Sequence, residues 1–317
     1  MNIITGTVQS SDPVRLDRYI AEELKLLTRS QLKARLVSIL VNGRGAKPSR
    51  VVMEGDRFVV EIEDEIDQVA AAEDLELAVL YRDEQVIVID KAQGMVTHPA
   101  HGNWRGTLAN GLLGLASAER LADGASAAPA SSPAPLRAGI VHRLDKDTSG
   151  VIIAARTAAA QEFLASQFRD RSTVKIYLAI VIGTPATSTG RIDTWLARDP
   201  RDRKRFAVAA EGQGRRAVTD WKILARGEGF TLLALRPRTG RTHQLRVHCK
   251  YLGCPILGDP IYARRDRLFP NATLMLHARE LSICLPGTTE TRRFRADVPD
   301  RFLAILRELG IESSMES

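Results

Sequence analysis

The hydrophobic pattern of the chain first predicts a small domain over residues 12–62. Its first helix is indicated by apolar residues that recur at helical spacing, namely Leu16, Tyr19, Ile20 and Leu24. Ser30 can cap a second helix over residues 31–36. The run 39–43 then predicts a strand that enters an Asn-Gly turn, and residues 56–62 predict the closing strand.

A second, longer domain is predicted over residues 75–309. Apolar and β-branched runs predict strands at 77–81, 86–90, 173–182, 217–224, 230–235 and 280–285. Helical spacing and capping residues predict helices at 108–113, 157–170, 242–252 and 299–309. In the long strand 173–182, alternation puts the aliphatic residues on one face, so Tyr177 is expected to face away from the aliphatic core.

Three segments lack such patterns. Residues 63–74 are acidic and contain several alanines without alternation, which predicts a linker between the two domains. Residues 116–138 are mostly Ala, Ser and Pro, and this composition predicts a disordered surface insertion because too little apolar bulk is present to offset ordering entropy. Residues 310–317 are expected to form a tail.

The stretch 139–155 contains the main candidate for a catalytic residue, the carboxylate of Asp145. Two short β-branched runs flank a polar turn, which predicts a strand, a tight turn at Asp145 and a second strand. A carboxylate at such a corner is compatible with a nucleophile, a metal ligand or a residue that only forms the turn. A calcium loop is disfavoured because its twelfth position, which should be Glu, is Arg156. An aspartyl-phosphate site is disfavoured by His142 and Arg143 directly before the carboxylate.

A strongly basic stretch lies in the last third of the chain. No acidic residue occurs between Phe230 and Gly258. Within it, Thr242 can cap a helix that Gly253 would end. The buried stripe predicted for this helix comprises Leu245, Cys249 and Leu252. Arg246 lies one step off that stripe, so it can reach a partner at the edge of the core.

Composition restricts the class of protein. The 317 residues are 44% hydrophobic and 26% charged, which is typical of a soluble globular protein, and the net charge of +7 favours an anionic partner. Three cysteines without a Cys-x-x-Cys spacing predict a reducing compartment, and their spacing from His243 and His248 matches no zinc site. No signal peptide or membrane-spanning run is present, so we expect a cytoplasmic protein.

Three motifs together resemble one family. His142–Gly150 resembles the signature of the RluA/RluD family of RNA pseudouridine synthases, in which the Asp that maps to Asp145 is the catalytic carboxylate. Lys175-x-Tyr177 resembles a second motif, whose Tyr stacks on the target base. Gly240–His248 resembles a third, in which the pair at Leu245 and Arg246 packs under the base and forms a salt bridge to the catalytic Asp. The resemblance spans both domains except the 116–138 insertion and the tail.

The resemblance implies an α+β pseudouridine synthase fold with a mixed, mainly antiparallel sheet. It also implies that residues 12–62 form an alpha-L RNA-binding domain, whose basic residues lie on or beside the second helix and the turn. Asp145, Tyr177 and Arg246 are then the expected catalytic residues. The expected substrate-binding residues are Arg143, Leu245, Arg241 and His243.

The resemblance further implies an isomerase that converts uridine to pseudouridine and needs neither cofactor nor metal. The expected partner is large-subunit (23S) ribosomal RNA or a ribosome-assembly intermediate, and the expected state is a monomer. Asp145 is either a nucleophile at the anomeric carbon or a base at the 2′ position. The alternative is an RNA-binding ribosome-assembly factor without catalysis, but such a factor needs no carboxylate in an RNA site. A hydrolytic glycosidase is disfavoured because only one carboxylate is found where two are usual.

Overall fold

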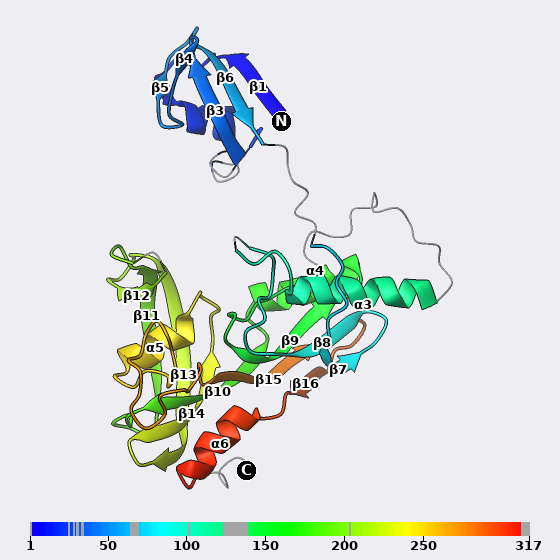
Figure 1. Ribbon diagram of the computed structural model, residues 1–317, viewed down its shortest axis with the longest axis vertical. Coiled ribbons are helices and arrows are strands. Elements are labelled where there is room, and N and C mark those ends of the chain that lie inside the picture. Colours follow the sequence, from blue (N-terminus) through cyan, green and yellow to red (C-terminus); the bar gives the residue numbers. More distant parts are fainter. Residues whose placement is uncertain are drawn as a thin grey trace. The chain divides into compact units, whose positions relative to one another are not determined.

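The computed structural model describes residues 2–311 except 25, 28, 30, 31, 33, 34, 64–69, 101, 123–138 and 203. By its internal contacts the chain divides into two compact units, Met1–Val69 and Ala70–Ser317, each of which is drawn in Figure 1. Among the described residues, no helix has the length and apolar character needed to cross a membrane.

The first unit is built on a small antiparallel sheet. Its strands lie in the order β1 (Asn2–Thr7), β6 (Arg57–Ile62), β3 (Leu36–Val41) and β4 (Arg44–Gly45). A separate pair is formed by β2 (Val14–Arg15) and β5 (Val51–Val52). The helical turns α1 (Leu16–Arg18) and η1 (Tyr19–Glu23) bury Leu16, Tyr19 and Ile20 against this sheet.

The sequence pattern anticipated most, though not all, of this unit. The predicted Asn-Gly turn is confirmed, because Asn42 and Gly43 both have positive φ (51° and 75°) between β3 and β4. Leu24, predicted to face the core, is instead exposed. Strand β1 lies outside the range 12–62 and pairs with β6 along its whole length. Ser30, the predicted cap of the second helix, and much of that helix lie outside the described residues.

The second unit contains one large mixed sheet, which confirms the expected α+β class. Its main path runs β12 (Phe206–Ala209), β11 (Thr189–Arg198), β13 (Arg215–Gly227), β14 (Phe230–Pro237), β10 (Val174–Ile182), β15 (Leu276–Cys284), β9 (Ser149–Ala155), β8 (Val86–Lys91) and β7 (Ala78–Arg82). Strand β16 (Thr291–Arg295) pairs with β15 off this path. All of these pairs are antiparallel except β9 with β15, which is parallel.

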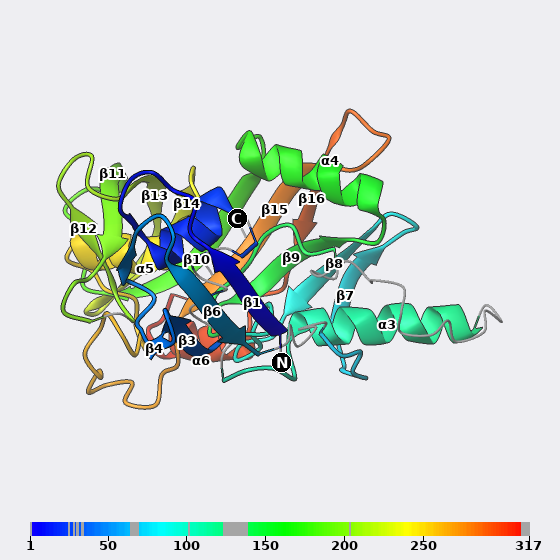
Figure 2. The same cartoon turned by 90° about the horizontal axis from the view of Figure 1, so that it is seen from above.

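Helices cover both faces of the sheet around β8 and β9. Alternate residues of these strands point to opposite faces. One set, including Val88 and Ile153, packs against α4 (Ala158–Arg169), which Thr157 caps. The other set, including Ile89 and Ile152, packs against α3 (Leu108–Ala122). Figure 2 shows α3 and α4 on opposite sides of these strands.

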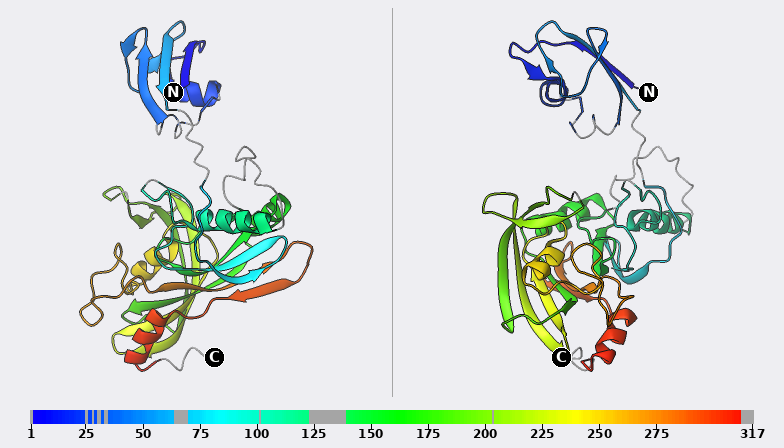
Figure 3. Two further views of the ribbon diagram at one scale, coloured as in Figure 1. Left: turned by 45° about the vertical axis from the view of Figure 1, so that its right-hand side comes forward. Right: turned by 60° about the vertical axis from the view of Figure 1, so that its left-hand side comes forward.

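The other half of the sheet carries two further helices. Helix α5 (Gln244–Tyr251) packs against one side of β11, β13 and β14, and α6 (Asp300–Glu308) follows the last strand (Figure 3). The predicted helix 299–309 is confirmed by α6, and the predicted strands at 217–224 and 230–235 are confirmed by the antiparallel pair β13 and β14.

Three local expectations were wrong. Helix α3 continues to Ala122 and so occupies the start of the 116–138 insertion, because Ala, Glu, Arg and Leu in this part are good helix formers; residues 123–138 lie outside the described residues. The segment before Asp145 is a loop and not a strand: Ile140 forms an isolated bridge to Ala154 of β9, whereas the carbonyl of Leu144 accepts from the hydroxyl of Thr97. Strand β10 is buried on both faces between Leu178 and Val181, so Tyr177 packs against apolar residues as well.

Gly150, at the parallel junction of β9 and β15, is a position where only glycine fits. Its φ is +114°, and a Cβ there would lie 2.2 Å from the carbonyl oxygen of Ala278. We expect Gly150→Ala to lower the free energy of unfolding by at least about 2 kcal/mol, measured by urea denaturation. Gly240→Ala is the control, since nothing lies within 4 Å of its Cβ position, and it should change stability by no more than about 1 kcal/mol. Equal stability of the two variants would contradict the steric argument.

Candidate active site

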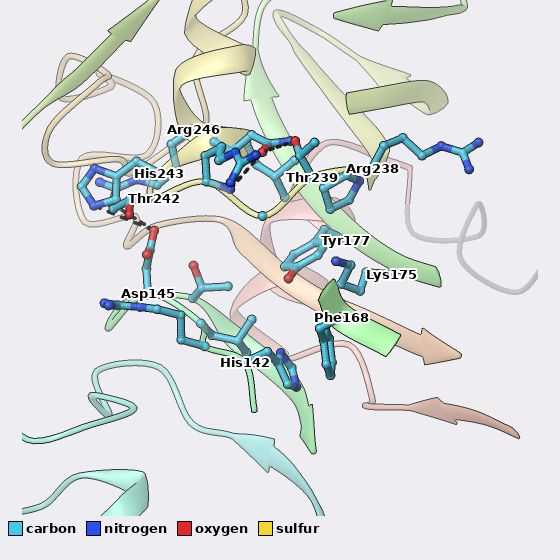
Figure 4. A pocket seen from close by; sticks show the side chains of 18 of the residues that line it. His142, Asp145, Phe168, Lys175, Tyr177, Arg238, Thr239, Thr242, His243 and Arg246 are labelled. Carbon is cyan, nitrogen blue, oxygen red and sulfur yellow. Dashed lines mark hydrogen bonds and ion pairs between the residues drawn. The ribbon is translucent and has the colours of Figure 1, made fainter. Parts of the chain in front are cut away.

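A cavity of about 430 Å³ opens where the loop before β9, strand β10 and the segment leading into α5 meet. All seven residues singled out from the sequence line it: Arg143, Asp145, Tyr177, Arg241, His243, Leu245 and Arg246. Figure 4 shows several of them around the pocket. Residues separated by about a hundred positions in the sequence are therefore brought into one site.

The turn that carries Asp145 is held through its backbone carbonyls. Thr97 donates from its hydroxyl to the carbonyl of Leu144 (2.8 Å), and the amide of Thr148 donates to the carbonyl of Asp145 itself (3.1 Å). Gln93 donates from its side-chain amide to the carbonyl of Asp147 (2.9 Å). These bonds fix the backbone from which the Asp145 side chain projects.

Lys91 also stabilises this turn, through hydrogen bonds to backbone carbonyls. Its side chain is fully buried, and its ammonium donates to the carbonyls of Ala92 (2.9 Å), Met95 (2.8 Å) and Lys146 (3.2 Å). Burial lowers the pKa of Lys91 to about 8, although the carboxylates of Asp147 and Asp145 raise it. Lys91 was not predicted from the sequence as a support of the site. An isolated Lys directly after the apolar strand 86–90 was the available signal.

His142 fixes the start of the loop and with it the exposed neighbour Arg143. Its ring stacks on Phe168 with centroids 4.4 Å apart, and its Nε2 accepts a hydrogen bond from the amide of Ile153 (3.0 Å). Burial, with a smaller contribution from the ammonium of Lys175, lowers the pKa of His142 to about 3. His142 is therefore a neutral structural residue, and Arg143 extends from this anchored loop to the rim of the pocket.

Helix α5 begins differently from the prediction. Thr242 is exposed and does not cap it, because His243 precedes the helix in a left-handed conformation (φ 56°). The amide of Arg241 instead donates to the side chain of Gln244 (3.0 Å), which also accepts from the hydroxyl of Thr239 (2.7 Å). The predicted end of the helix before Gly253 is confirmed.

Arg246 is buried and lies between two carboxylates. Its Nε and Nη2 donate to Asp259 at 2.8 and 2.7 Å, whereas its Nη1 is 3.6 Å from Oδ2 of Asp145. Burial opposes the charge of Arg246, but the bonds to Asp259 and the nearby Asp145 outweigh it and raise the pKa of Arg246. Arg246 thus faces Asp145 as expected, yet its short contacts are with Asp259.

Asp259 was given no role from the sequence, although a signal was present. Asp259 is the first acidic residue after the stretch from Phe230 to Gly258 that lacks any. An arginine at the edge of the core needs a carboxylate partner, and Asp259 is the nearest acidic residue after Arg246 in the sequence. Its side chain is fully buried.

His243 also faces the carboxylate. Its Nε2 is 3.9 Å from Oδ2 of Asp145, and its Nδ1 lies 2.9 Å from the hydroxyl of Tyr262. Burial lowers the pKa of His243 by more than Asp145 raises it, so the ring is neutral at neutral pH. The hydroxyl oxygen of Tyr262 accepts from the amide of Phe206 (2.9 Å), and the hydroxyl can donate its own hydrogen to Nδ1 of His243. In that arrangement the ring hydrogen of His243 is on Nε2 and points toward Asp145. Tyr262 was not among the residues predicted from the sequence.

The remaining predicted residues form the walls of the pocket. Leu245 is buried at its lining, and Tyr177 projects into it from β10 (Figure 4). Burial and the charge of Asp145 raise the pKa of Tyr177, which keeps it a neutral phenol. Arg241 also lines the pocket and donates from Nε to the carbonyl of Arg216 (3.1 Å).

The lining is strongly cationic. Among its residues, all of which are described, Asp145 is the one acidic group, and the cations are Arg143, Arg169, Arg171, Lys175, Arg238, Arg241 and Arg246. Such a concave cationic surface attracts polyanions. Within the described part of the chain, no group of three or more His, Cys, Asp or Glu residues is placed to hold a metal ion.

Comparison with known proteins points to one family. Residues 85–251 match the family described as RNA pseudouridylate synthase. The chain is 38% identical over 299 residues to the ribosomal large subunit pseudouridine synthase D of Borreliella burgdorferi, covering 92% of this chain and 89% of that protein. It is 34% identical to an uncharacterised RNA pseudouridine synthase of Bacillus subtilis, covering 98% of each.

A solved structure agrees with these sequence matches. The human RNA pseudouridylate synthase domain containing 4 superimposes with a TM-score of 0.57 at 27% identity, covering 74% of this chain and 93% of that one. The fold expected from the motifs is therefore confirmed.

The low pKa of His142 predicts how stability depends on pH. The folded protein resists protonation of His142 down to about pH 3, whereas the unfolded chain takes up that proton near pH 6.5, so stability falls as the pH drops through this window. His142→Gln, whose side-chain oxygen can still accept from Ile153, should give a shallower loss of thermal stability between pH 6.5 and 4.5. His248 and His277, with pKa values lowered to about 4 by burial, contribute to the pH dependence that remains in the variant. An unchanged slope in the variant would show that His142 protonates freely in the folded state.

Proposed function

The chain belongs to the RNA pseudouridylate synthase family, and from this premise we propose that it converts specific uridines of large-subunit ribosomal RNA to pseudouridine, with Asp145 as the catalytic carboxylate. As a pseudouridine synthase it is an isomerase. The proposal rests mainly on one observation: Asp145 is the single carboxylate in the lining of a cationic pocket and lies 3.6 Å from the buried guanidinium of Arg246. The aromatic ring of Tyr177 lines the same pocket.

The reaction requires the bond between the sugar C1′ and uracil N1 to break and a bond between C1′ and C5 to form. The proton on C5 is lost and N1 gains one, so the product is an isomer of the substrate and no electrons are exchanged. Asp145 can attack C1′ as a nucleophile or take the proton from C2′ as a base, and the geometry of the pocket is compatible with both routes.

Each neighbour of Asp145 has a role in this proposal. Arg246 places a positive charge 3.6 Å from Asp145, whose carboxylate is the reacting group in either route. Tyr177 stacks on the loosened uracil, and Leu245 forms the floor beneath it. Because its pKa is raised, Tyr177 is a poor base for the C5 proton, which favours the stacking role over proton removal.

The target uridine must leave its base stack before it can enter the pocket. A uridine within a helix or stacked loop has to leave its stack to place C1′ next to Asp145. Arg143, exposed at the rim next to Asp145, is suited to bind the flanking phosphate or to fill the space that the base vacates. His243 and Arg241 complete the substrate contacts on the side of α5.

Large-subunit ribosomal RNA is the proposed substrate because a relative named for it matches over 92% of this chain. We further propose that the first unit is an alpha-L RNA-binding domain. Four exposed basic residues on or beside its turns support this role: Arg44, Lys47, Arg50 and Arg57. A ribosome-assembly factor without catalysis is the competing proposal, and the carboxylate of Asp145 opposite Arg246 in the pocket favours the enzyme.

Asp145→Asn should abolish pseudouridine formation while leaving the fold and RNA binding nearly unchanged, because only the charge is lost. The measurement is tritium release from RNA labelled at C5 of uridine, combined with a binding titration. Asp147→Asn, two residues further along the same turn and outside the pocket lining, is the matched control and should keep the wild-type rate. Substantial turnover by the Asp145 variant would remove this carboxylate from the mechanism, and an inactive wild-type protein that still binds RNA would favour the assembly factor.

Removal of residues 1–69 should weaken RNA binding and lessen its salt dependence, yet leave slow activity on a small RNA fragment at saturation. The expected drop in the slope of log K against log salt is roughly 0.7 to 0.9 for each lost phosphate contact. The matched control is the intact chain with Arg44, Lys47, Arg50 and Arg57 changed to Gln, which should reproduce most of the change in slope. Unchanged affinity and slope after truncation would contradict RNA binding by the first unit, and a folded but inactive truncated protein would show that both units take part in the chemistry.

A further inference from the structure

Arg301, near the start of α6, forms a hydrogen bond to the segment that carries Asp145. Its Nη2 donates to the hydroxyl oxygen of Ser149 (2.6 Å), four residues after the candidate catalytic carboxylate. We propose that Arg301 is a positioning residue: by binding Ser149 it sets where the Asp145 turn lies relative to the opposite wall of the pocket. The inference rests on the proposed function, because it takes Asp145 as the reacting carboxylate.

The pocket is assembled from two parts of the second unit. The turn that carries Asp145 continues into β9, whereas Tyr177 and Arg246 lie on β10 and α5. Strand β15 lies between β9 and β10 in the sheet. It pairs with β10 over six residue pairs but with β9 over two, at Ser149 and Gly150. The backbone pairing that joins the two parts of the pocket is therefore short on the side of β9.

Arg301 spans this short junction. Helix α6 packs against β10, β14 and β15, since its residues Phe302 and Leu306 lie in one buried core with residues of those strands (Figure 1). Arg301 directly precedes Phe302, so the base of its side chain belongs to this part of the unit. Its guanidinium ends at Ser149 of β9. One hydrogen bond thus connects the part that carries the opposite wall to the part that carries the Asp145 turn.

The contact has a fixed direction and continues to β15. A guanidinium can only donate, so the oxygen of Ser149 accepts from Arg301, and its own hydrogen is available for Nδ1 of His277, 2.9 Å away. Burial lowers the pKa of His277 to about 4, so the ring is neutral at neutral pH and can accept. The three side chains therefore connect α6, β9 and β15 at the point where the backbone pairing is short.

The stability of α6 does not explain why an arginine stands here. Arg301 is the second residue of the helix, where the partial positive charge of the helix N-terminus disfavours a cation. Burial lowers its pKa, and the charge of Asp90 offsets only part of this effect. Its Nε is buried without a hydrogen-bond partner among the described residues. A residue that violates three local rules at once points to a role in the neighbouring site.

Loss of this bond should affect the chemical step more than RNA binding. The distance from Nη1 of Arg246 to Oδ2 of Asp145 is 3.6 Å, and it spans the two parts that Arg301 connects. A shift of β9 would change this distance and the approach of the carboxylate to the sugar. Arg301 is absent from the pocket lining, so the cations that attract RNA stay in place without it.

The central variant is Arg301→Met, which keeps a long apolar side chain and removes the charge and the donors. We expect the single-turnover rate per folded molecule at saturating RNA to fall roughly 10-fold, while the Kd for RNA changes by less than twofold. The melting temperature should equal or exceed that of the wild type, because an unfavourable cation is removed from the helix N-terminus. A lower melting temperature with an unchanged rate per folded molecule would overturn the inference, since a purely structural role predicts that result.

Arg307→Met is the matched control, because it makes the same substitution in the last turn of the same helix at an exposed position. A cation is favourable at this end of the helix, so the variant should melt no higher than the wild type. It should keep the wild-type rate. A 10-fold loss of rate in this control would show that any loss of charge from α6 has the effect, which contradicts a specific role of Arg301.

A double-mutant cycle tests whether Arg301 acts through Ser149. Ser149→Ala removes the acceptor and should lower the single-turnover rate about as much as Arg301→Met. In the Ser149→Ala background, Arg301→Met should reduce the rate by no more than about twofold further. Rate losses that multiply in the double variant would show that the two residues act independently and would refute the inference.

Two further outcomes separate this inference from the proposed function. If Arg301→Met does not fold, Ser149→Ala alone tests the same bond: a reduced rate with unchanged Kd supports the inference, and a wild-type rate contradicts it. A wild-type rate for Arg301→Met together with an inactive Asp145→Asn would refute the positioning role alone. An active Asp145→Asn would instead refute the proposed function.

Discussion

A guanidinium buried within the second unit has to be paired, and this requirement determines how the site is built. Helix α5 has eight residues, and six of them, Gln244 to Cys249, are buried. Three of these six are polar: Gln244 bonds to Thr239 and Thr219, His248 lies within hydrogen-bonding distance of Thr219 and Thr194, and Arg246 bonds to Asp259. A polar helix inside a core is stable in one position, where every donor and acceptor is satisfied. The same contacts that hold α5 in place therefore set where Arg246 points.

The order of the sheet explains how distant segments reach one pocket. Strand β10 pairs with β14 on one side and with β15 on the other, so Tyr177 stands where the two halves of the sheet join. The register of β10 and β15 shifts between Ile176 and Tyr177, and such bulges are common next to active sites because they redirect side chains. The parallel pairing of β9 with β15 sets Ser149 beside His277, which brings the Asp145 turn, four residues earlier, to the same edge.

Local features of this architecture could be predicted, and features that depend on distant partners could not. The Asn42-Gly43 turn and the end of α5 before Gly253 involve neighbours in sequence, and these predictions were correct. The predicted cap of α5 was wrong because His243 takes a left-handed conformation, and its ring lies 2.9 Å from the hydroxyl of Tyr262, a residue 19 positions further along the chain. Asp259 was missed for a related reason: its importance comes from a partner thirteen residues earlier that is buried by tertiary packing. The seven residues in the pocket were found through motifs, which carry information on the site that hydrophobic periodicity does not.

The turn around Asp145 shows why a short polar motif needs the rest of the unit. Turns usually satisfy their own backbone groups or leave them to water. Here the carbonyls of Leu144, Lys146 and Asp147 are bound by Thr97, Lys91 and Gln93, which lie in one segment that begins at the last residue of β8. Burying Lys91 is costly, as the fall of its pKa to about 8 indicates, and three carbonyl oxygens together with nearby carboxylates offset that cost. This segment fixes the backbone of the Asp145 turn, and Asp259 fixes the guanidinium of Arg246. The side chain of Asp145 itself is not held by such bonds in the described contacts, so it can react. The pocket is thus rigid on both sides of the single side chain that has to change its bonds.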